Sequence, residues 1–226
     1  RIHVRPQLPD ATEADEGMKV VVEITSWNSP HTEPMATITE TLGPAGDHET
    51  EMQAIIRSGG FSENFPPPIA EAAQELYDNR EQIFADAVED TKGPDAVRKD
   101  MRDVTTFTID PADAKDFDDA LSFRRLDNGQ VEVGIHIADV SHYVEEGGRI
   151  DQEARERGTS IYLVDRVIPM LPEVLSNDLC SLRPHEDRLA FSAVFTLDEQ
   201  ANVTDEWYGQ TIIHSDRRFS YEEAQA

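Results

Sequence analysis

Cysteine is nearly absent from this sequence. Its 226 residues contain one cysteine, Cys180, which excludes an intrachain disulfide, and no metal-site spacing surrounds it. A lone cysteine is typical of a small core residue in a reducing compartment, so we expect a cytoplasmic protein. The printed sequence also lacks an apolar run long enough to span a membrane, so we expect no membrane partner.

Positive charge is scarce as well. The chain carries 20 lysine and arginine residues against 46 acidic ones, a net charge of −26, and only four of the basic residues are lysines. Such a balance repels nucleic acid at long range unless cations or basic segments elsewhere compensate. A source adapted to high salt would produce this surface, a hypothesis that predicts a stability that changes between low and molar KCl.

The first hundred residues pass from strands to helices. The composition, with 38% hydrophobic and 29% charged residues, is typical of a soluble globular protein. Alternating β-branched residues predict strands at 18–27 and 36–46 around a polar, proline-bearing hairpin loop. Helical spacing follows at 48–58 and ends at a glycine pair. After the stiff sequence FPPP, apolar residues at helical spacing predict a helix or helix pair over 69–90.

From residue 105 onward the pattern is mostly β. Two strands are predicted at 105–110 and 120–126, and the sequence DNG then supplies the turn of a hairpin. The next strand, QVEVGIHIADV, places four β-branched residues on one face: Val131, Val133, Ile135 and Ile137. We therefore expect an α+β fold. Its remaining elements are a helix at 149–158, an extended and buried segment at 160–172, two strands within 189–215 and a helix start at 220–226.

The stretch TFTIDPADAKDFDDALSF, residues 106–123, gathers five aspartates and no glutamate between two strand-like runs. About one residue in five of this chain is acidic, so a solvated acidic loop is the plain alternative. A calcium-binding loop is excluded because the third position of that pattern is occupied here by Ala112. Short carboxylates on a tight backbone suit the octahedral coordination of Mg²⁺, and neighbouring carboxylates coexist best with cations between them. Two such ions ~4 Å apart are a common device for phosphodiester hydrolysis.

Three sequence stretches together carry a family resemblance: TIDPADAKDFDDAL, VGIHIADVSHYV and IPMLPEVLSNDLCSLRP. They resemble the RNB catalytic domain of the ribonuclease II/ribonuclease R family, and the second stretch is closest to the ribonuclease R branch. The N-terminal strands are similar to the last strands of the cold-shock (OB) barrel that precedes the RNB domain in that family. The resemblance implies a partial cold-shock domain at 1–47, a helical connector at 48–100 and a truncated RNB domain with a mixed sheet at 101–226.

The resemblance also implies an activity. The family members are processive 3′→5′ exoribonucleases that hydrolyse single-stranded RNA from its 3′ end to nucleoside 5′-monophosphates with two Mg²⁺ ions, for which Mn²⁺ can substitute. Position by position, the family's catalytic and metal-binding aspartates fall on Asp110, Asp116, Asp118 and Asp119. Asp113 has no counterpart and is expected to be a surface acid. The full-length protein is expected to be a monomer.

Other residues receive a role from the same comparison. Tyr162 matches the aromatic that stacks on the terminal base, with a core tyrosine as the alternative, and Tyr221 is a candidate for lining the RNA channel. His136 is expected to be structural rather than a ligand. Asp139 and His142 are expected to shape the loop beneath the acidic cluster.

The family's transition-state arginine and its S1 RNA-binding domain fall beyond residue 226, so we expect this chain to be a piece of a longer protein with little or no activity alone. Two rival functions remain open: a non-catalytic RNA-binding module and a phosphodiesterase for small nucleotides. A degenerate module is expected to lose at least one of the four aspartates, and none is lost here.

Overall fold

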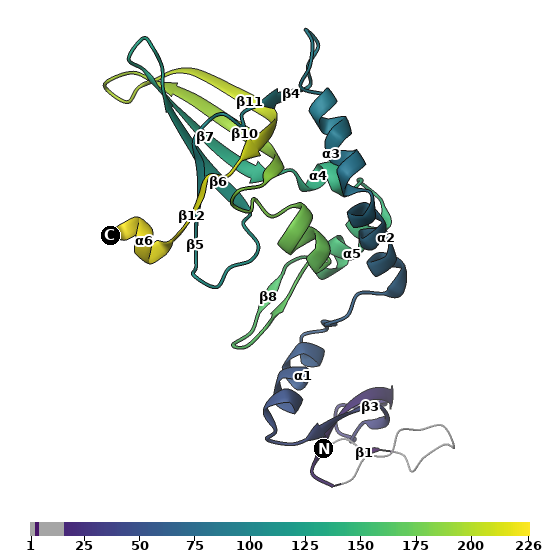
Figure 1. Cartoon of the computed structure of the whole chain (residues 1–226). Helices are drawn as coiled ribbons and strands as arrows, with labels where there is room; N and C mark the ends of the chain where they lie inside the picture. Colours follow the sequence, from purple (N-terminus) through teal and green to yellow (C-terminus); the bar gives the residue numbers. More distant parts are fainter. Residues whose placement is uncertain (1–2, 5–15) are drawn as a thin grey trace. The chain divides into compact units, whose positions relative to one another are not determined.

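The computed structural model describes residues 3–4 and 16–226 and divides the chain into two compact units (Figure 1). The first unit contains residues up to 64 together with 162–168, and the second contains 65–161 together with 169–226. Each unit has its own sheet. Within the described residues, no helix is long and apolar enough to cross a membrane.

The first unit is built on a hairpin, with strands β2 (Met18–Ser26) and β3 (Met35–Pro44) paired antiparallel, as the alternating sequence predicts. The short strand β1 (His3–Val4) adds to β3 in parallel, giving the order β1-β3-β2. Helix α1 (His48–Ser58) follows and begins where the side chain of Asp47 accepts a hydrogen bond from the Thr50 backbone. The predicted strands and helix of this region are therefore confirmed.

A second, smaller hairpin contributes its tip to the first unit. Strands β8 (Ile161–Tyr162) and β9 (Val167–Ile168) pair only with each other, and the loop between them carries Arg166. The Arg166 guanidinium bonds to Glu49 of α1 at 2.6 Å and to Glu63 at 3.0 Å. The predicted extended conformation of this segment is confirmed. Its predicted burial holds only for the second half, where Ile168 and Leu171 are buried, and is wrong for the first half, where Tyr162 is 68% exposed. The reason is that the hairpin does not join a larger sheet.

The second unit contains a seven-stranded mixed sheet in the order β12-β5-β6-β7-β10-β11-β4. Its central strands are antiparallel, while β12 pairs with β5 and β4 pairs with β11 in parallel. The predicted strands are confirmed, as is the α+β class. The bounds are β4 Arg98–Asp100, β5 Thr106–Asp110, β6 Asp119–Arg125, β7 Val131–Ala138, β10 Asp187–Leu197, β11 Val203–His214 and β12 Arg217–Ser220.

Helices gather at one end of this sheet (Figure 1). The predicted helix pair is confirmed as α2 (Pro67–Asp78) and α3 (Arg80–Glu89), which meet at Asn79. Helix α5 (Arg149–Arg157) stops at Gly158, whose φ of 73° suits glycine. Three short elements complete the unit: α4 Val140–Tyr143, the π-helix η1 Leu175–Leu179 and α6 Tyr221–Gln225.

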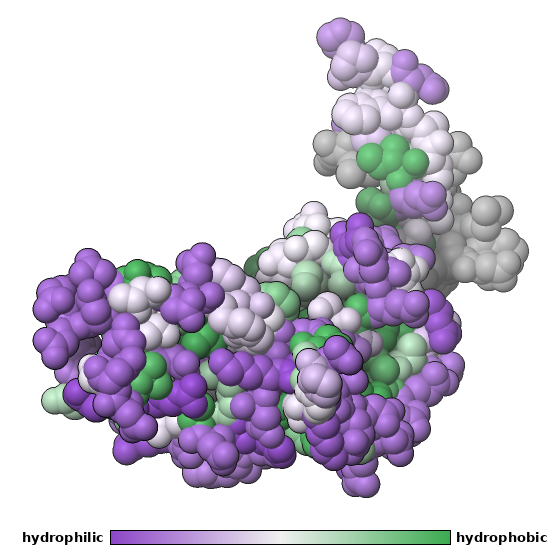
Figure 2. Space-filling view, turned by 90° about the horizontal axis from the view of Figure 1, so that it is seen from above, coloured by the Kyte–Doolittle hydropathy of each residue, from purple (hydrophilic) through white to green (hydrophobic). Residues whose placement is uncertain are grey.

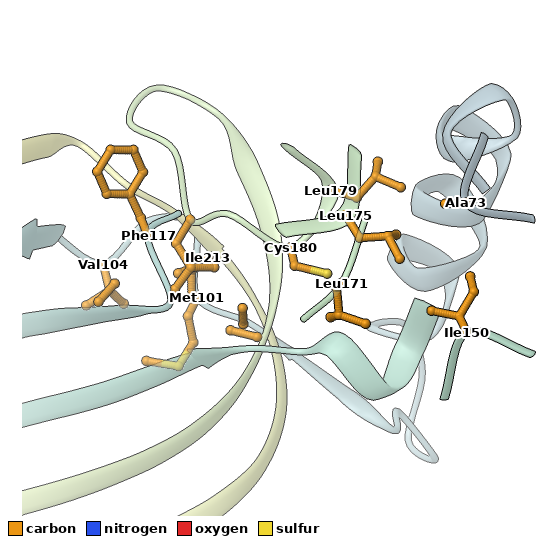
Figure 3. Close-up of a cluster of buried hydrophobic side chains, with 14 of the residues drawn as sticks. Ala73, Met101, Val104, Phe117, Ile150, Leu171, Leu175, Leu179, Cys180 and Ile213 are labelled. Atoms are coloured by element: carbon orange, nitrogen blue, oxygen red, sulfur yellow. The ribbon is translucent and has the colours of Figure 1, made fainter. Parts of the chain in front are cut away.

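The main core lies between the sheet and these helices. Figure 3 shows Leu171, Leu175 and Leu179 beside the helix that carries Ala73, with Phe117 farther along the same cluster. Cys180 is buried there, and burial raises the pKa of its thiol to about 12. The expected core role of this cysteine is therefore confirmed.

Strand β7 presents its apolar side outward. Its buried residues are Glu132, Gly134, His136 and Ala138, whereas Ile137 of the predicted apolar face is 50% exposed. The buried imidazole of His136 has hydrogen-bond partners within the protein, the Ser192 and Ser122 hydroxyls at 2.6 and 2.8 Å. The expected structural role of His136 is thus confirmed. Figure 2 shows hydrophobic side chains scattered between the hydrophilic ones on the visible face.

Candidate functional site

The acidic loop, residues 110–119, connects β5 to β6. The two strands pair at Thr106 with Ser122 and Phe107 with Leu121, and beyond these pairs they diverge. Asp110 is therefore the last residue of β5 and Asp119 the first residue of β6. The divergence leaves room at the ends of these two strands for the loop that holds the remaining aspartates.

The backbone of this loop is fastened from two neighbouring segments. The Ser181 hydroxyl accepts a hydrogen bond from the Phe117 amide at 3.0 Å and donates one to the Lys115 carbonyl at 2.9 Å. The Leu182 amide donates to the Phe117 carbonyl at 2.8 Å, and Ala138 of β7 donates to the Asp118 carbonyl at 2.9 Å. Because Phe117 is also buried in the core, the second half of the loop is a fixed platform for its carboxylates.

Four of the five aspartates act on one another electrostatically. Burial raises the pKa of Asp110, and the charges of Asp119 and Asp116 raise it further, whereas the Thr108 hydroxyl and the charge of Arg218 lower it. Partial burial also raises the pKa of Asp118, followed by the charges of Asp116, Asp119 and Asp110. Among the described residues, Asp113 is not one of the charges that act on these two carboxyl groups. The carboxylates of the cluster therefore repel one another, and the Arg218 charge offsets part of this repulsion at Asp110.

A divalent cation fits this set of donors. The buried Asp110 Oδ2 atom has no hydrogen-bond partner among the described residues, and an unsatisfied buried carboxylate oxygen is costly unless a cation or donor reaches it. Within the same residues, no three carboxylate, imidazole or thiol groups already converge on one point. The aspartates are thus close enough to interact electrostatically without already forming a convergent set of ligands.

The two candidate tyrosines lie in different units. Tyr221 is 56% exposed and begins α6 directly after Ser220, which pairs with Asp110 across β12 and β5. The structure therefore brings Tyr221 to the end of the strand that opens the acidic loop. Tyr162 belongs to the first unit, and its 68% exposure excludes the alternative of a core tyrosine.

A buried ion pair lies behind the end of β7. Asp139 accepts a hydrogen bond from Arg98 at 2.9 Å, and each side chain is 1% exposed. His142 contacts the same guanidinium at 3.3 Å. A second arginine, Arg218, contacts the acidic loop at Pro111. No local sequence pattern predicts the role of Arg98 or Arg218, because the residues that they contact are distant along the chain.

Comparison with known proteins gives two family matches. The family model of the RNB domain matches residues 98–226, and the family model of the cold shock domain matches residues 2–66. DIS3-like exonuclease 2 of Xenopus tropicalis is 40% identical over 208 residues, which are 91% of this chain and 24% of that protein. Ribonuclease R of Thermotoga maritima is 40% identical over 97% of this chain and 30% of its own length.

Solved structures show the same likeness. RNase R of Mycoplasma genitalium, in complex with ribose-methylated single-stranded RNA, superimposes with a TM-score of 0.83 at 29% identity. The match covers 99% of this chain and 33% of that one. Yeast Ssd1, described as a pseudonuclease, shares the fold with a TM-score of 0.68 at 23% identity. The chain thus spans about a quarter to a third of the length of these proteins.

Proposed function

Because the chain belongs to the RNB-domain family of ribonucleases, we propose that it carries the metal-binding half of a processive 3′→5′ exoribonuclease. The substrate is the 3′ end of single-stranded RNA, and the products are nucleoside 5′-monophosphates. The observation that carries the proposal is the acidic loop, on which Asp110, Asp116, Asp118 and Asp119 are all present, and where burial and the charges of neighbouring aspartates raise the pKa of Asp110 and Asp118.

The four aspartates have separate roles in this proposal. Asp110 and Asp119, at the two ends of the loop, hold one Mg²⁺ ion. Asp116 and Asp118 complete a second site and orient the attacking water, and Mn²⁺ can replace Mg²⁺. When bound, two such ions supply an activated water and stabilise the leaving oxygen of the phosphodiester. Asp113 has no counterpart in the family pattern and does not act on the Asp110 or Asp118 carboxyl groups, so it stays outside the site.

The tyrosines bind RNA rather than metal. Tyr162 stacks on the terminal base, an interaction worth ~1–3 kcal/mol per base that tolerates any sequence. Tyr221 lines the RNA path beside the acidic loop. We expect a cytoplasmic monomer in the full-length protein, and both expectations stay predictions.

The chain alone is proposed to have little or no activity. The relatives are about three to four times longer, and the family resemblance assigns the arginine that stabilises the transition state to a later part of the sequence. Loss of such a group costs about 10²–10³-fold in rate. Rapid Mg²⁺-dependent release of mononucleotides by the 226-residue chain would contradict this part of the proposal.

The experiment uses the natural full-length protein with Asp118→Asn. Release of mononucleotides from an end-labelled adenosine oligomer is expected to fall at least ~100-fold, while RNA binding by fluorescence anisotropy is unchanged. Asp127→Asn is the matched control, since Asp127 is an exposed acid in the neighbouring hairpin turn. Full cleavage by Asp118→Asn would mean that the site is wrongly assigned.

The non-catalytic RNA-binding module remains the second candidate. It is favoured by one observation, the fold shared with a protein described as a pseudonuclease. The two functions differ in the same assay: the module binds the oligomer but releases no mononucleotide in the wild-type full-length protein at any Mg²⁺ concentration. A phosphodiesterase for small nucleotides would instead show no preference for oligomer length.

A further inference from the structure

Arg218 contacts both ends of the acidic loop. It lies on β12, the edge strand that runs parallel to β5, and pairs with Thr108, two residues before Asp110. Its Nη2 atom donates a hydrogen bond to the Pro111 carbonyl at 2.6 Å. Its guanidinium carbon lies 5.1 Å from the centre of the Phe117 ring. One side chain therefore joins Pro111, near the start of the loop, to the buried aromatic Phe117 near its end.

These two contact points are themselves anchored differently. The Pro111 carbonyl also accepts a hydrogen bond from the Ala114 amide at 3.0 Å, which closes a turn in the first half of the loop. Phe117 is fixed by Ser181 and Leu182, as described above. Arg218 thus connects the turn in the first half of the loop to the rigid second half.

Arg218 does this without occupying a carboxylate. Within the described residues no carboxylate lies within ion-pair distance of it, although its charge acts on Asp110 from farther away and lowers the pKa of that carboxyl. Its buried Nε atom has no hydrogen-bond partner among these residues. The buried Asp110 Oδ2 atom nearby is equally unpartnered. A direct ion pair would have competed with a cation for Asp110, whereas contacts to a carbonyl and an aromatic ring leave that carboxylate available.

We propose that Arg218 is a positioning residue that sets the spacing of the metal-binding aspartates by clamping the acidic loop at Pro111 and Phe117. This rests on the proposed function, because it assumes that the loop binds divalent cations. The proposal predicts the direction in which the cation affinity changes when Arg218 is removed. Removing a positive charge near a cation site should tighten cation binding if charge alone matters, whereas removing a clamp should weaken it.

The test is a titration of the 226-residue chain with Mn²⁺ alone, with free Mn²⁺ followed by electron paramagnetic resonance. Arg218→Ala is expected to weaken Mn²⁺ binding about 10-fold or more, the cost typical of losing a group that orients metal ligands. Arg218→Lys, which keeps the charge and one donor, is expected to recover part of that loss. Thermal unfolding of each variant shows whether the second unit still folds.

Arg217→Ala is the matched control. Arg217 is the neighbouring residue, exposed, and contacts the Phe219 ring at 4.2 Å and Glu223 at 4.0 Å rather than the acidic loop. The Arg217→Ala variant loses the same positive charge as Arg218→Ala. Its Mn²⁺ affinity should therefore equal that of the wild type or increase slightly.

The outcomes separate the two proposals. Wild-type or tighter Mn²⁺ binding by both Arg218→Ala and Arg218→Lys, alongside weak binding by Asp118→Asn, overturns the role of Arg218 alone. Wild-type binding by Asp118→Asn overturns the metal site and the inference with it. If Arg218→Ala does not fold, Arg218→Lys decides: unchanged affinity contradicts the clamp, and weakened affinity with unchanged thermal unfolding supports it.

Discussion

The buried pair of Arg98 and Asp139 offers a prediction whose size can be worked out from the structure. Arg98 donates to the Asp139 carboxylate and to the Thr211 carbonyl, each at 2.9 Å. Both side chains of the pair are 1% exposed. Replacing Asp139 by Asn keeps the shape of the side chain but leaves the arginine charge buried without a counter-charge.

The expected cost is large because water cannot reach the remaining charge. Breaking one partner of a buried ion pair costs ~3–5 kcal/mol, and for a chain of this length each kcal/mol lowers the melting temperature by ~2–4 °C. Asp139→Asn should therefore lower the melting temperature of the second unit by ~6–20 °C. Replacing both partners by apolar residues, Arg98→Met with Asp139→Leu, should cost less than Asp139→Asn alone.

Differential scanning calorimetry of the chain measures these shifts. The control is Glu89→Gln, which breaks the pair of Glu89 with Lys92, whose side chains are 70% and 60% exposed. That change should cost less than ~1 kcal/mol. The reasoning is refuted if Asp139→Asn costs no more than the control, or if the double variant loses as much stability as the single one.

Three further predictions concern other parts of the chain. Burial lowers the pKa of His136 to about 4, below its ordinary value of 6.5. The neutral imidazole therefore stabilises the fold above pH 6.5, and this contribution, on the order of 3 kcal/mol, is lost as the pH falls towards 4. Urea unfolding of His136→Gln at several pH values should lack this component of the pH dependence. A Cβ atom on Gly134 would lie 2.4 Å from the Ser122 hydroxyl and 2.6 Å from the His136 ring, so Gly134→Ala should destabilise the second unit by ~1–3 kcal/mol, and urea unfolding that matches the wild type would contradict the packing described. In the full-length protein, Tyr162→Ala should raise the KM for oligomeric RNA by the equivalent of ~1–3 kcal/mol, because the stacking partner of the base is lost. Tyr162→Trp should keep the KM near the wild-type value, and equal KM values for the two variants would exclude stacking.

Local sequence patterns predict most of the secondary structure here. The period of two in residues 18–27 and the helical spacing of residues 48–58 appear in the structure as β2 and α1. Such patterns succeed because each element's hydrogen bonds and caps involve residues close in the sequence. The acidic loop is equally visible in the sequence, since five aspartates fall within ten consecutive positions.

Burial and long-range contacts were harder to predict. The valines and isoleucines of β7 suggest a core face, yet the buried face carries Glu132 and His136, because Arg124 pairs with Glu132 and two serines satisfy the histidine. Arg218 contacts Pro111 from a position 107 residues away, so no local pattern relates the two. The exposure of Tyr162 likewise depends on its hairpin remaining outside the seven-stranded sheet.

The central claim is that four of the five aspartates form a metal-dependent site and one does not. The most direct test compares Mg²⁺-dependent release of mononucleotides by the full-length protein carrying single Asp→Asn changes at positions 110, 113, 116, 118 and 119. We expect Asp113→Asn to keep the wild-type rate and each of the other four to lose at least ~10-fold of it, with RNA binding retained in all. Equal rates for all five variants, or a loss confined to Asp113→Asn, would contradict the account.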